Sequence, residues 1–259
     1  MYFMIDVVFI NPNSSEKAYQ DLAITFSAIE TPTWSLLLAQ ACRSKGFKVS
    51  ILDCDAERLD LKTSLERIEE IDPKLLCFVV YGQNPNSGTT SMIGASLLGK
   101  YIKENTSKYP ICFVGSHTSA LPKQVLKHSF VDFVLLNEGV YALQNLLNTD
   151  LKSELHKVKG IGWKQDGIIK LNSPEIVVPQ DRMDFDLPGY AWDLLPFKKK
   201  PLDLYRAHFW HAGFSHKNRT PFAAIYTSLG CRFSCNFCMI NIVNRNDTQI
   251  ILMLHILKE

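Results

Sequence analysis

The stretch Leu75-Leu-Cys-Phe-Val-Val-Tyr81 is followed directly by Gly82-Gln-Asn-Pro-Asn-Ser-Gly88. The first run is apolar throughout, which indicates a strand buried on both faces. The second run is a polar loop that begins and ends with glycine. Strands buried on both faces are typical of parallel sheets that are covered by helices on both sides. The two runs therefore predict one β–α unit of an α/β fold.

The same alternation of an apolar strand and an amphipathic helix extends over the first 147 residues. The expected strands cover residues 3–10, 48–53, 75–81, 111–115 and 131–136, and the expected helices cover residues 33–45, 61–71, 89–104, 121–128 and 140–147. Five such repeats predict a flavodoxin-like (Rossmann-like) five-stranded parallel sheet with helices on both faces. In the strand order 2-1-3-4-5, a ligand binds beyond the carboxyl ends of the strands, between strands one and three.

Polar loops made of small residues follow four of the expected strands, at residues 11–15, 82–88, 115–119 and 137–139. They offer backbone N–H groups and hydroxyls without bulky side chains. A large ligand with amide and phosphate groups would suit them. Ordinary β–α turns have the same composition, so both interpretations stay open.

A second stretch, Tyr226-Thr-Ser-Leu-Gly-Cys231-Arg-Phe-Ser-Cys235-Asn-Phe-Cys238, holds three cysteines with the spacing C-x3-C-x2-C. Three thiolates on one short loop can hold an iron–sulfur cluster and leave one iron open. Gly230 permits a sharp turn, and the apolar residues 222–226 predict a strand before the loop. The alternatives are a zinc loop without its fourth ligand, or cysteines buried as small hydrophobic residues.

These cysteines, with the aromatic Phe237 before the third, resemble the radical S-adenosylmethionine (SAM) superfamily. The resemblance implies that Cys231, Cys235 and Cys238 bind a [4Fe–4S] cluster, and that SAM occupies the open iron and is cleaved to a 5′-deoxyadenosyl radical. It also implies that Phe237 lies near the adenine of SAM.

An α/β unit upstream of such a loop resembles the cobalamin-dependent class of radical SAM enzymes. Residues 137–139, Asn-Glu-Gly, are similar to that class's Gly-Glu-Gly turn, and residues 186–196 resemble its interdomain segment, which ends in Trp-Asp-Leu-Leu-Pro. If the likeness holds, the residues near cobalamin are Asn13, Gly82, Gln83, Asn84, Gly115, Ser116, His117, Thr118, Glu138 and Gly139.

The pattern D-x-H-x-x-G, whose histidine ligates cobalt in many cobalamin domains, does not occur in this sequence. His117 lies in a suitable loop but lacks those flanking residues, so we interpret it as a loop histidine. The cobalt is then expected to lack a protein imidazole.

The expected domains are a cobalamin-binding domain at 1–150, a hairpin and proline-rich connector at 151–220 (the hairpin at 160–171), and the start of a radical SAM domain at 221–259. A TIM-like barrel takes about 200 residues or more, whereas 39 residues follow from Pro221, including an expected helix at 250–257. We therefore expect an N-terminal fragment with an incomplete barrel. A histidine-rich stretch in the connector favours a structural or substrate-side role; it contains His208, Trp210, His211 and His216.

A net charge of +2 does not suggest a nucleic-acid partner, and no apolar run is long enough for a membrane helix. Seven cysteines without a signal peptide favour a reducing compartment, so a cytoplasmic location is expected. Four of the cysteines are expected to be core or near-surface thiols: Cys42, Cys54, Cys77 and Cys112.

The expected function is that of a cobalamin-dependent radical SAM enzyme acting in methyl transfer to an unactivated carbon. Relatives that form rings or rearrange carbon skeletons leave the reaction type open. The resemblance implies a small-molecule substrate and an electron donor such as flavodoxin or ferredoxin, and no catalytic residue is assigned. The alternatives are a cobalamin-binding module without turnover, or another ligand in the α/β domain combined with a structural cluster.

Overall fold

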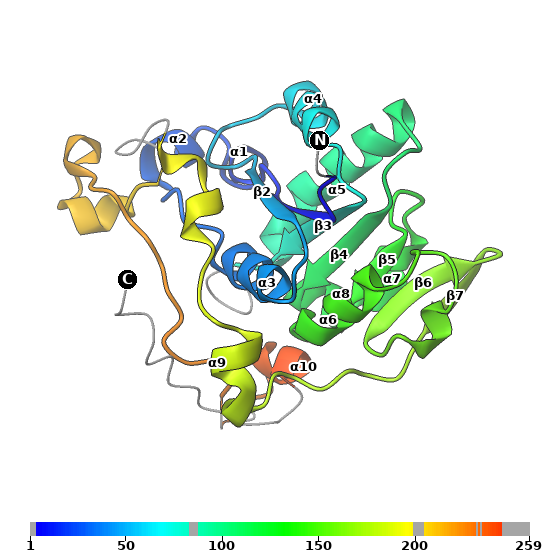
Figure 1. Cartoon of the computed structure of the whole chain (residues 1–259). Coiled ribbons are helices and arrows are strands. Elements are labelled where there is room, and N and C mark those ends of the chain that lie inside the picture. Colours follow the sequence, from blue (N-terminus) through cyan, green and yellow to red (C-terminus); the bar gives the residue numbers. More distant parts are fainter. Residues whose placement is uncertain (1–3, 83–87, 199–204, 232, 234, 245–259) are drawn as a thin grey trace.

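A seven-stranded sheet runs through the computed structural model, which describes residues 4–82, 88–198, 205–231, 233 and 235–244 (Figure 1). The strand order is β2-β1-β3-β4-β5-β6-β7; the first five strands pair in parallel, and the last two pair antiparallel. The strands are β1 (Val7–Asn11), β2 (Val49–Asp53), β3 (Leu75–Val80), β4 (Ile111–Gly115), β5 (Phe133–Leu135), β6 (Ile161–Gln165) and β7 (Ile168–Leu171). The order of the first five strands is the predicted one.

The central strand β3 is buried along its whole length, as its composition predicted. Leu75, Cys77 and Val79 belong to one hydrophobic cluster, and the alternate residues Leu76, Phe78 and Val80 belong to the other. Each face of the sheet therefore has its own core, which accounts for the absence of a polar residue in this strand.

Helices cover both faces of the sheet. Helices α3 and α8 supply the core on one face, and α4, α5 and α7 supply it on the other (Figure 1). The α-helices are α1 (Ser15–Tyr19), α2 (Leu22–Phe26), α3 (Thr33–Ser44), α4 (Leu61–Ile71), α5 (Gly88–Asn105), α6 (Ser116–Ala120), α7 (Pro122–Lys127), α8 (Val140–Leu147), α9 (Met183–Asp186) and α10 (Ile240–Asn244). Short 3-10 turns cover Leu155–Lys157, Gln180–Arg182, Trp192–Leu194, Pro196–Lys198, Phe209–Ala212 and His216–Asn218.

The predicted hairpin forms, but it is part of the main sheet. Strand β6 pairs with β5, so the hairpin adds two antiparallel strands to the parallel set. Its turn is Asp166-Gly167, and both residues have positive φ angles of 51° and 77°. The sequence predicted the Asp-Gly turn. It did not predict that the hairpin would pair with β5.

The predicted strand at 222–226 does not form: these residues belong to no ladder with the residues that the structure describes. The only bridge nearby joins Arg206 to Pro221. An apolar composition favours a strand, but a strand also needs a neighbour with free backbone groups. The predicted helix at 250–257 lies outside the described residues.

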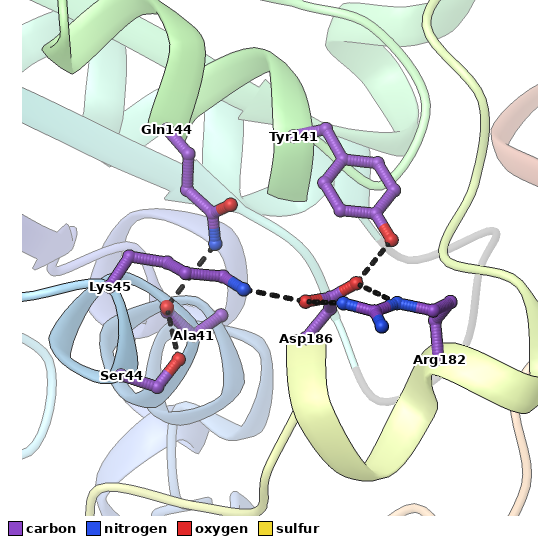
Figure 2. A network of polar contacts seen from close by, with 7 residues as sticks. All are labelled: Ala41, Ser44, Lys45, Tyr141, Gln144, Arg182 and Asp186. Atoms are coloured by element: carbon purple, nitrogen blue, oxygen red, sulfur yellow. Dashed lines mark hydrogen bonds and ion pairs between the residues drawn. The ribbon is translucent and has the colours of Figure 1, made fainter.

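A buried carboxylate ties the connector to the α/β domain (Figure 2). Asp186 at the end of α9 is almost fully buried and accepts hydrogen bonds from Lys45 Nζ (2.7 Å), Tyr141 Oη (2.7 Å) and Arg182 Nε (3.0 Å). Lys45 directly follows α3 and Tyr141 lies on α8, so one side chain joins three segments. Burial opposes ionisation, but these donors lower the pKa of Asp186 to about 2.

Candidate functional site

The loops that follow β1 and β3 border a cavity of about 720 Å³ at the carboxyl edge of the sheet. This is the predicted position between strands one and three, where the strand order reverses. The wall also includes the first turn of α3 and residues of the connector. Of the predicted ligand residues, only Gly82 lines the cavity; Gln83 and Asn84 lie outside the described residues.

Asn13 has a structural role in this arrangement. Its Nδ2 donates to the carbonyl of Leu59 at 3.2 Å. Its own carbonyl lies so close to α5 that a Cβ on Gly94 would stand 2.3 Å from it. The neighbouring residues Asn11, Pro12 and Ser14 line the cavity instead of Asn13.

The predicted loop at 115–119 is helical in the structure, because α6 begins directly after β4. This helix contains two buried hydroxyls without a partner among the described residues, Ser116 Oγ and Thr118 Oγ1. Gly115, at φ +146°, brings β4 so close to β3 that a Cβ would stand 2.1 Å from the carbonyl of Val80. A Cβ on Gly88 would stand 2.3 Å from Ser116 Oγ. Burying a hydroxyl without a hydrogen bond is costly, and both residues are fully buried, so a ligand reaches these atoms only if the segment around them moves.

The predicted loop histidine His117 has a partner in the adjoining helix. Its Nδ1 lies 3.1 Å from Thr89 Oγ1 at the start of α5. Burial lowers the pKa of His117, which favours the neutral ring.

The turn after β5 has the left-handed backbone conformation that asparagine and glycine favour. Its side chains make hydrogen bonds within the protein. Asn137 and Gly139 both have positive φ angles, 59° and 78°, and asparagine is one of the few side chains that tolerate this region. Glu138 is buried, and its Oε2 accepts from the backbone N–H of Val178 at 2.9 Å. Burial raises the pKa of Glu138 to about 7. Residues 115–118 and 138–139 lie outside the cavity wall.

An aromatic wall, which the sequence analysis did not predict, closes the inner side of the cavity. Trp34, Tyr81 and Tyr226 make it up, with the centroid of Trp34 4.9 Å from that of Tyr81 and 6.4 Å from that of Tyr226. The phenol oxygen of Tyr81 is buried and has no partner among the described residues. The three residues are far apart in the sequence, so no motif connects them.

The connector completes the outer side of the cavity with part of its histidine-rich stretch. His208 and Trp210 both line the cavity, and their rings stack at 4.1 Å with an interplanar angle of 12°. The Nε2 of His208 lies 3.0 Å from Glu30 Oε1. The sequence indicated a cluster here, but not the cavity that it faces.

A buried carboxylate network fixes the connector beside the cavity. Asp53, at the end of β2, accepts from Asn11 Nδ2 (2.7 Å), from the N–H of Ala56 (3.1 Å) and from the hydroxyl of Tyr205 (2.8 Å). Burial raises the pKa of Asp53 to about 7 in spite of these donors. Tyr205 thereby joins the connector to the carboxyl ends of β1 and β2.

The cysteine loop contains the accessible thiols. Cys231 and Cys238 are partly exposed, Cys235 is exposed, and the N–H of Cys238 donates to the carbonyl of Cys235 at 3.1 Å. Within the described ranges, no three His, Cys, Asp or Glu side chains are gathered closely enough to hold a metal ion. The number and type of donors fit a cluster, but the structure does not bring the three sulfur atoms together. Phe237 is 78% exposed.

The other four cysteines are buried, in agreement with the prediction of core thiols: Cys42, Cys54, Cys77 and Cys112. Burial raises the pKa of Cys54 to about 12, so this thiol stays protonated at neutral pH. No helix among the residues that the structure describes is long and apolar enough to cross a bilayer.

Comparison with known proteins defines the class. The B12 binding domain family model matches residues 19–147. The matched residues include strands β2 to β5 of the sheet, so the chain contains a B12 binding domain.

Among known proteins, the chain is similar to an uncharacterized methyltransferase, PH0819, of Pyrococcus horikoshii, with 26% identity over 192 residues. The match covers 73% of this chain and 36% of that protein, so the chain spans about a third of its relative.

Two solved structures share the fold. The cobalamin-dependent S-adenosylmethionine radical enzyme OxsB, with aqua-cobalamin and S-adenosylmethionine bound, has a TM-score of 0.63 and 18% identity, over 91% of this chain and 28% of that one. The radical S-adenosylmethionine methyltransferase TsrM from Kitasatospora setae, with cobalamin and a [4Fe-4S] cluster bound, has a TM-score of 0.60 and 16% identity, over 92% of this chain and 42% of that one. The chain thus shares its fold with the matched parts of these two proteins.

Proposed function

We propose that this chain carries the cobalamin site and the cluster-binding cysteines of a cobalamin-dependent radical SAM methyltransferase. The observation that carries the proposal is the cavity at the strand-order reversal of a B12 binding domain. Two buried hydroxyls without a protein partner follow β4 at the same edge of the sheet, outside the cavity wall. A cavity of about 720 Å³ is within the usual size of a cofactor site.

The residues at this edge fit cobalamin chemically. Ser116 and Thr118 are free to donate to amide or phosphate oxygens, and the phenol of Tyr81 is free to do the same. Trp34 and Tyr226 offer flat apolar surface. Glycines at this edge let neighbouring segments pack closely, because a Cβ at these positions would collide with atoms of the next segment. Cobalamin, when bound, supplies the methyl-transfer chemistry. The chain's part is to orient it and to exclude water.

We further propose that Cys231, Cys235 and Cys238 hold a [4Fe–4S] cluster, with Phe237 beside SAM. Three accessible thiols with the spacing C-x3-C-x2-C support this assignment, because buried structural cysteines are inert and accessible ones are available as ligands. On this proposal the three sulfur atoms come together when the cluster forms.

The cobalamin assignment can be tested by titrating the protein with cyanocobalamin and measuring binding by equilibrium dialysis. Replacing both hydroxyls, Ser116→Ala with Thr118→Val, is expected to weaken binding by roughly 5- to 30-fold, since each hydrogen bond is worth about 1 kcal/mol. The apo protein should lose no stability, because the two hydroxyls have no partner there. Ser107→Ala, at an exposed serine near the opposite edge, is the control. Equal affinity in the double variant and the wild type would refute the assignment.

The alternative, a cobalamin-binding module without turnover, is favoured by the separation of the three thiols in the structure. Anaerobic reconstitution with iron and sulfide distinguishes the two functions. A product that cleaves SAM on reduction supports the enzyme. Cobalamin binding together with equal iron content in the wild type and a triple Cys→Ala variant supports the module.

A further inference from the structure

The segment that enters the cysteine loop is also part of the cavity wall. Tyr226 lines the cavity and precedes Cys231 by five residues. The segment belongs to no strand ladder among the described residues. A backbone hydrogen bond from the N–H of Phe222 to the carbonyl of Tyr205 (3.2 Å) holds its start, and side chains of other elements hold the residues that follow.

Hydroxyl groups hold the backbone of this segment in place of a neighbouring strand. The N–H of Tyr226 donates to the phenol oxygen of Tyr190 at 2.7 Å, and that phenol donates to the carbonyl of Tyr226 at 3.0 Å. The N–H of Ala224 donates to Thr31 Oγ1 at 3.2 Å, and Thr33 Oγ1 donates to the carbonyl of Ala224 at 3.0 Å. Thr31 and Thr33 line the cavity too, so one wall supports both the ligand space and the segment.

The side chain of Tyr226 joins two other parts of that wall. Its ring packs near Trp34, and its hydroxyl donates to the carbonyl of Gly82 at 3.4 Å. Three residues later, Leu229 is buried in the same core cluster as Trp34, and Cys231 follows after two more residues. The chain between the cavity and the first cysteine is therefore short and anchored at both ends.

From these contacts we infer that Tyr226 is a positioning residue that couples occupancy of the cobalamin cavity to the placement of Cys231. A ligand in the cavity touches the ring, and the backbone of the same residue leads within five residues to the thiol. This inference rests on the proposed cobalamin site, and the coupling is reciprocal by linkage.

The test is site-resolved thiol labelling, since four of the seven cysteines are buried and the three loop cysteines are not. The full chain is treated with a maleimide under anaerobic conditions, with and without saturating cyanocobalamin, and the labelled peptides are counted by mass spectrometry. In the wild type, cyanocobalamin should slow labelling of Cys231 at least about fivefold, the lower end of typical coupling between sites. Tyr226→Ala should reduce this effect to less than about twofold.

Three further variants show whether the effect is specific. Tyr226→Phe keeps the ring and should retain most of the slowing. Tyr190→Phe removes the hydroxyl that bonds both backbone groups of Tyr226 but leaves the ring of Tyr226 in place. This variant should reduce the slowing of Cys231 labelling. It also decides the test if Tyr226→Ala does not fold. Tyr101→Ala, the same change in a partly buried residue packed on the other face of the sheet, should behave as the wild type.

The outcomes separate this inference from the proposed function. If the wild type binds cyanocobalamin but Cys231 is labelled at an unchanged rate, the coupling is refuted and the cobalamin site stands. If cyanocobalamin slows labelling of Cys231 in folded Tyr226→Ala as much as in the wild type, other residues carry the coupling and the inference is overturned. If Tyr226→Ala does not fold, the same result in Tyr190→Phe overturns it. A wild type that binds no cobalamin refutes the proposed function, and the coupling with it.

Discussion

Replacing Asp186 by asparagine tests the link between the connector and the α/β domain (Figure 2). The carboxylate is 4% exposed, and its pKa falls from 3.8 to about 2. That shift corresponds to about 2 kcal/mol of stabilisation at pH 7. Lys45 and Arg182 are 38% and 49% exposed and can regain water. The total loss should therefore stay near about 2–3 kcal/mol, below the 3–5 kcal/mol typical of breaking a fully buried pair.

The pH dependence of this loss has a definite sign. Because the pKa of Asp186 is depressed in the folded state, the stabilisation is present above pH 4 and is lost as the pH falls through about 2. The difference in unfolding free energy between the wild type and Asp186→Asn should thus shrink to about half at pH 3.

Urea unfolding followed by circular dichroism at pH 7, 5 and 3 measures this difference. Asp181→Asn, the same change at an exposed residue of the preceding turn, is the matched control and should stay within about 0.5 kcal/mol of the wild type. A loss at Asp186 no larger than that of the control, or one equally large at pH 3 and pH 7, would contradict the reasoning.

Three other predictions concern the sheet edge and the thiols. Burial raises the pKa of Asp53 to about 7, so ionisation of Asp53 destabilises the folded state as the pH rises. Between pH 4 and pH 7 the unfolding free energy of the wild type should therefore fall by at least about 1 kcal/mol more than that of Asp53→Asn. An equal dependence of unfolding free energy on pH in the two proteins would contradict this prediction. Gly139→Ala should cost about 1–3 kcal/mol in urea unfolding, because φ is +78° and the new Cβ would stand 2.7 Å from Val114 Cγ2; a neutral effect would show that the turn adapts. In the native protein a maleimide should modify three of the seven cysteines, and all seven in urea; modification of Cys77 in the native protein would contradict the buried core.

The repeated strands were predictable because burial on both faces leaves an unambiguous apolar run, as in Leu75 to Val80. The edge of the sheet at which the cavity lies followed from the strand order alone. The cavity wall could not be predicted, because Trp34, Tyr81 and Tyr226 are brought together by packing between distant segments. The strand at 222–226 was predicted from composition, but the backbone groups of Ala224 and Tyr226 bond to side-chain hydroxyls that no local pattern reveals.

The hairpin of β6 and β7 determines where the sheet meets water. Strand β5 is only three residues long, and pairing with β6 covers its backbone groups. The outermost edge on that side is therefore β7, which exposes Ile168 and Leu171 with Lys170 between them. A lysine on an edge strand opposes pairing with a second chain. Replacing Lys170 by an apolar residue is therefore expected to promote pairing through this edge, at a position that does not line the cavity between β1 and β3.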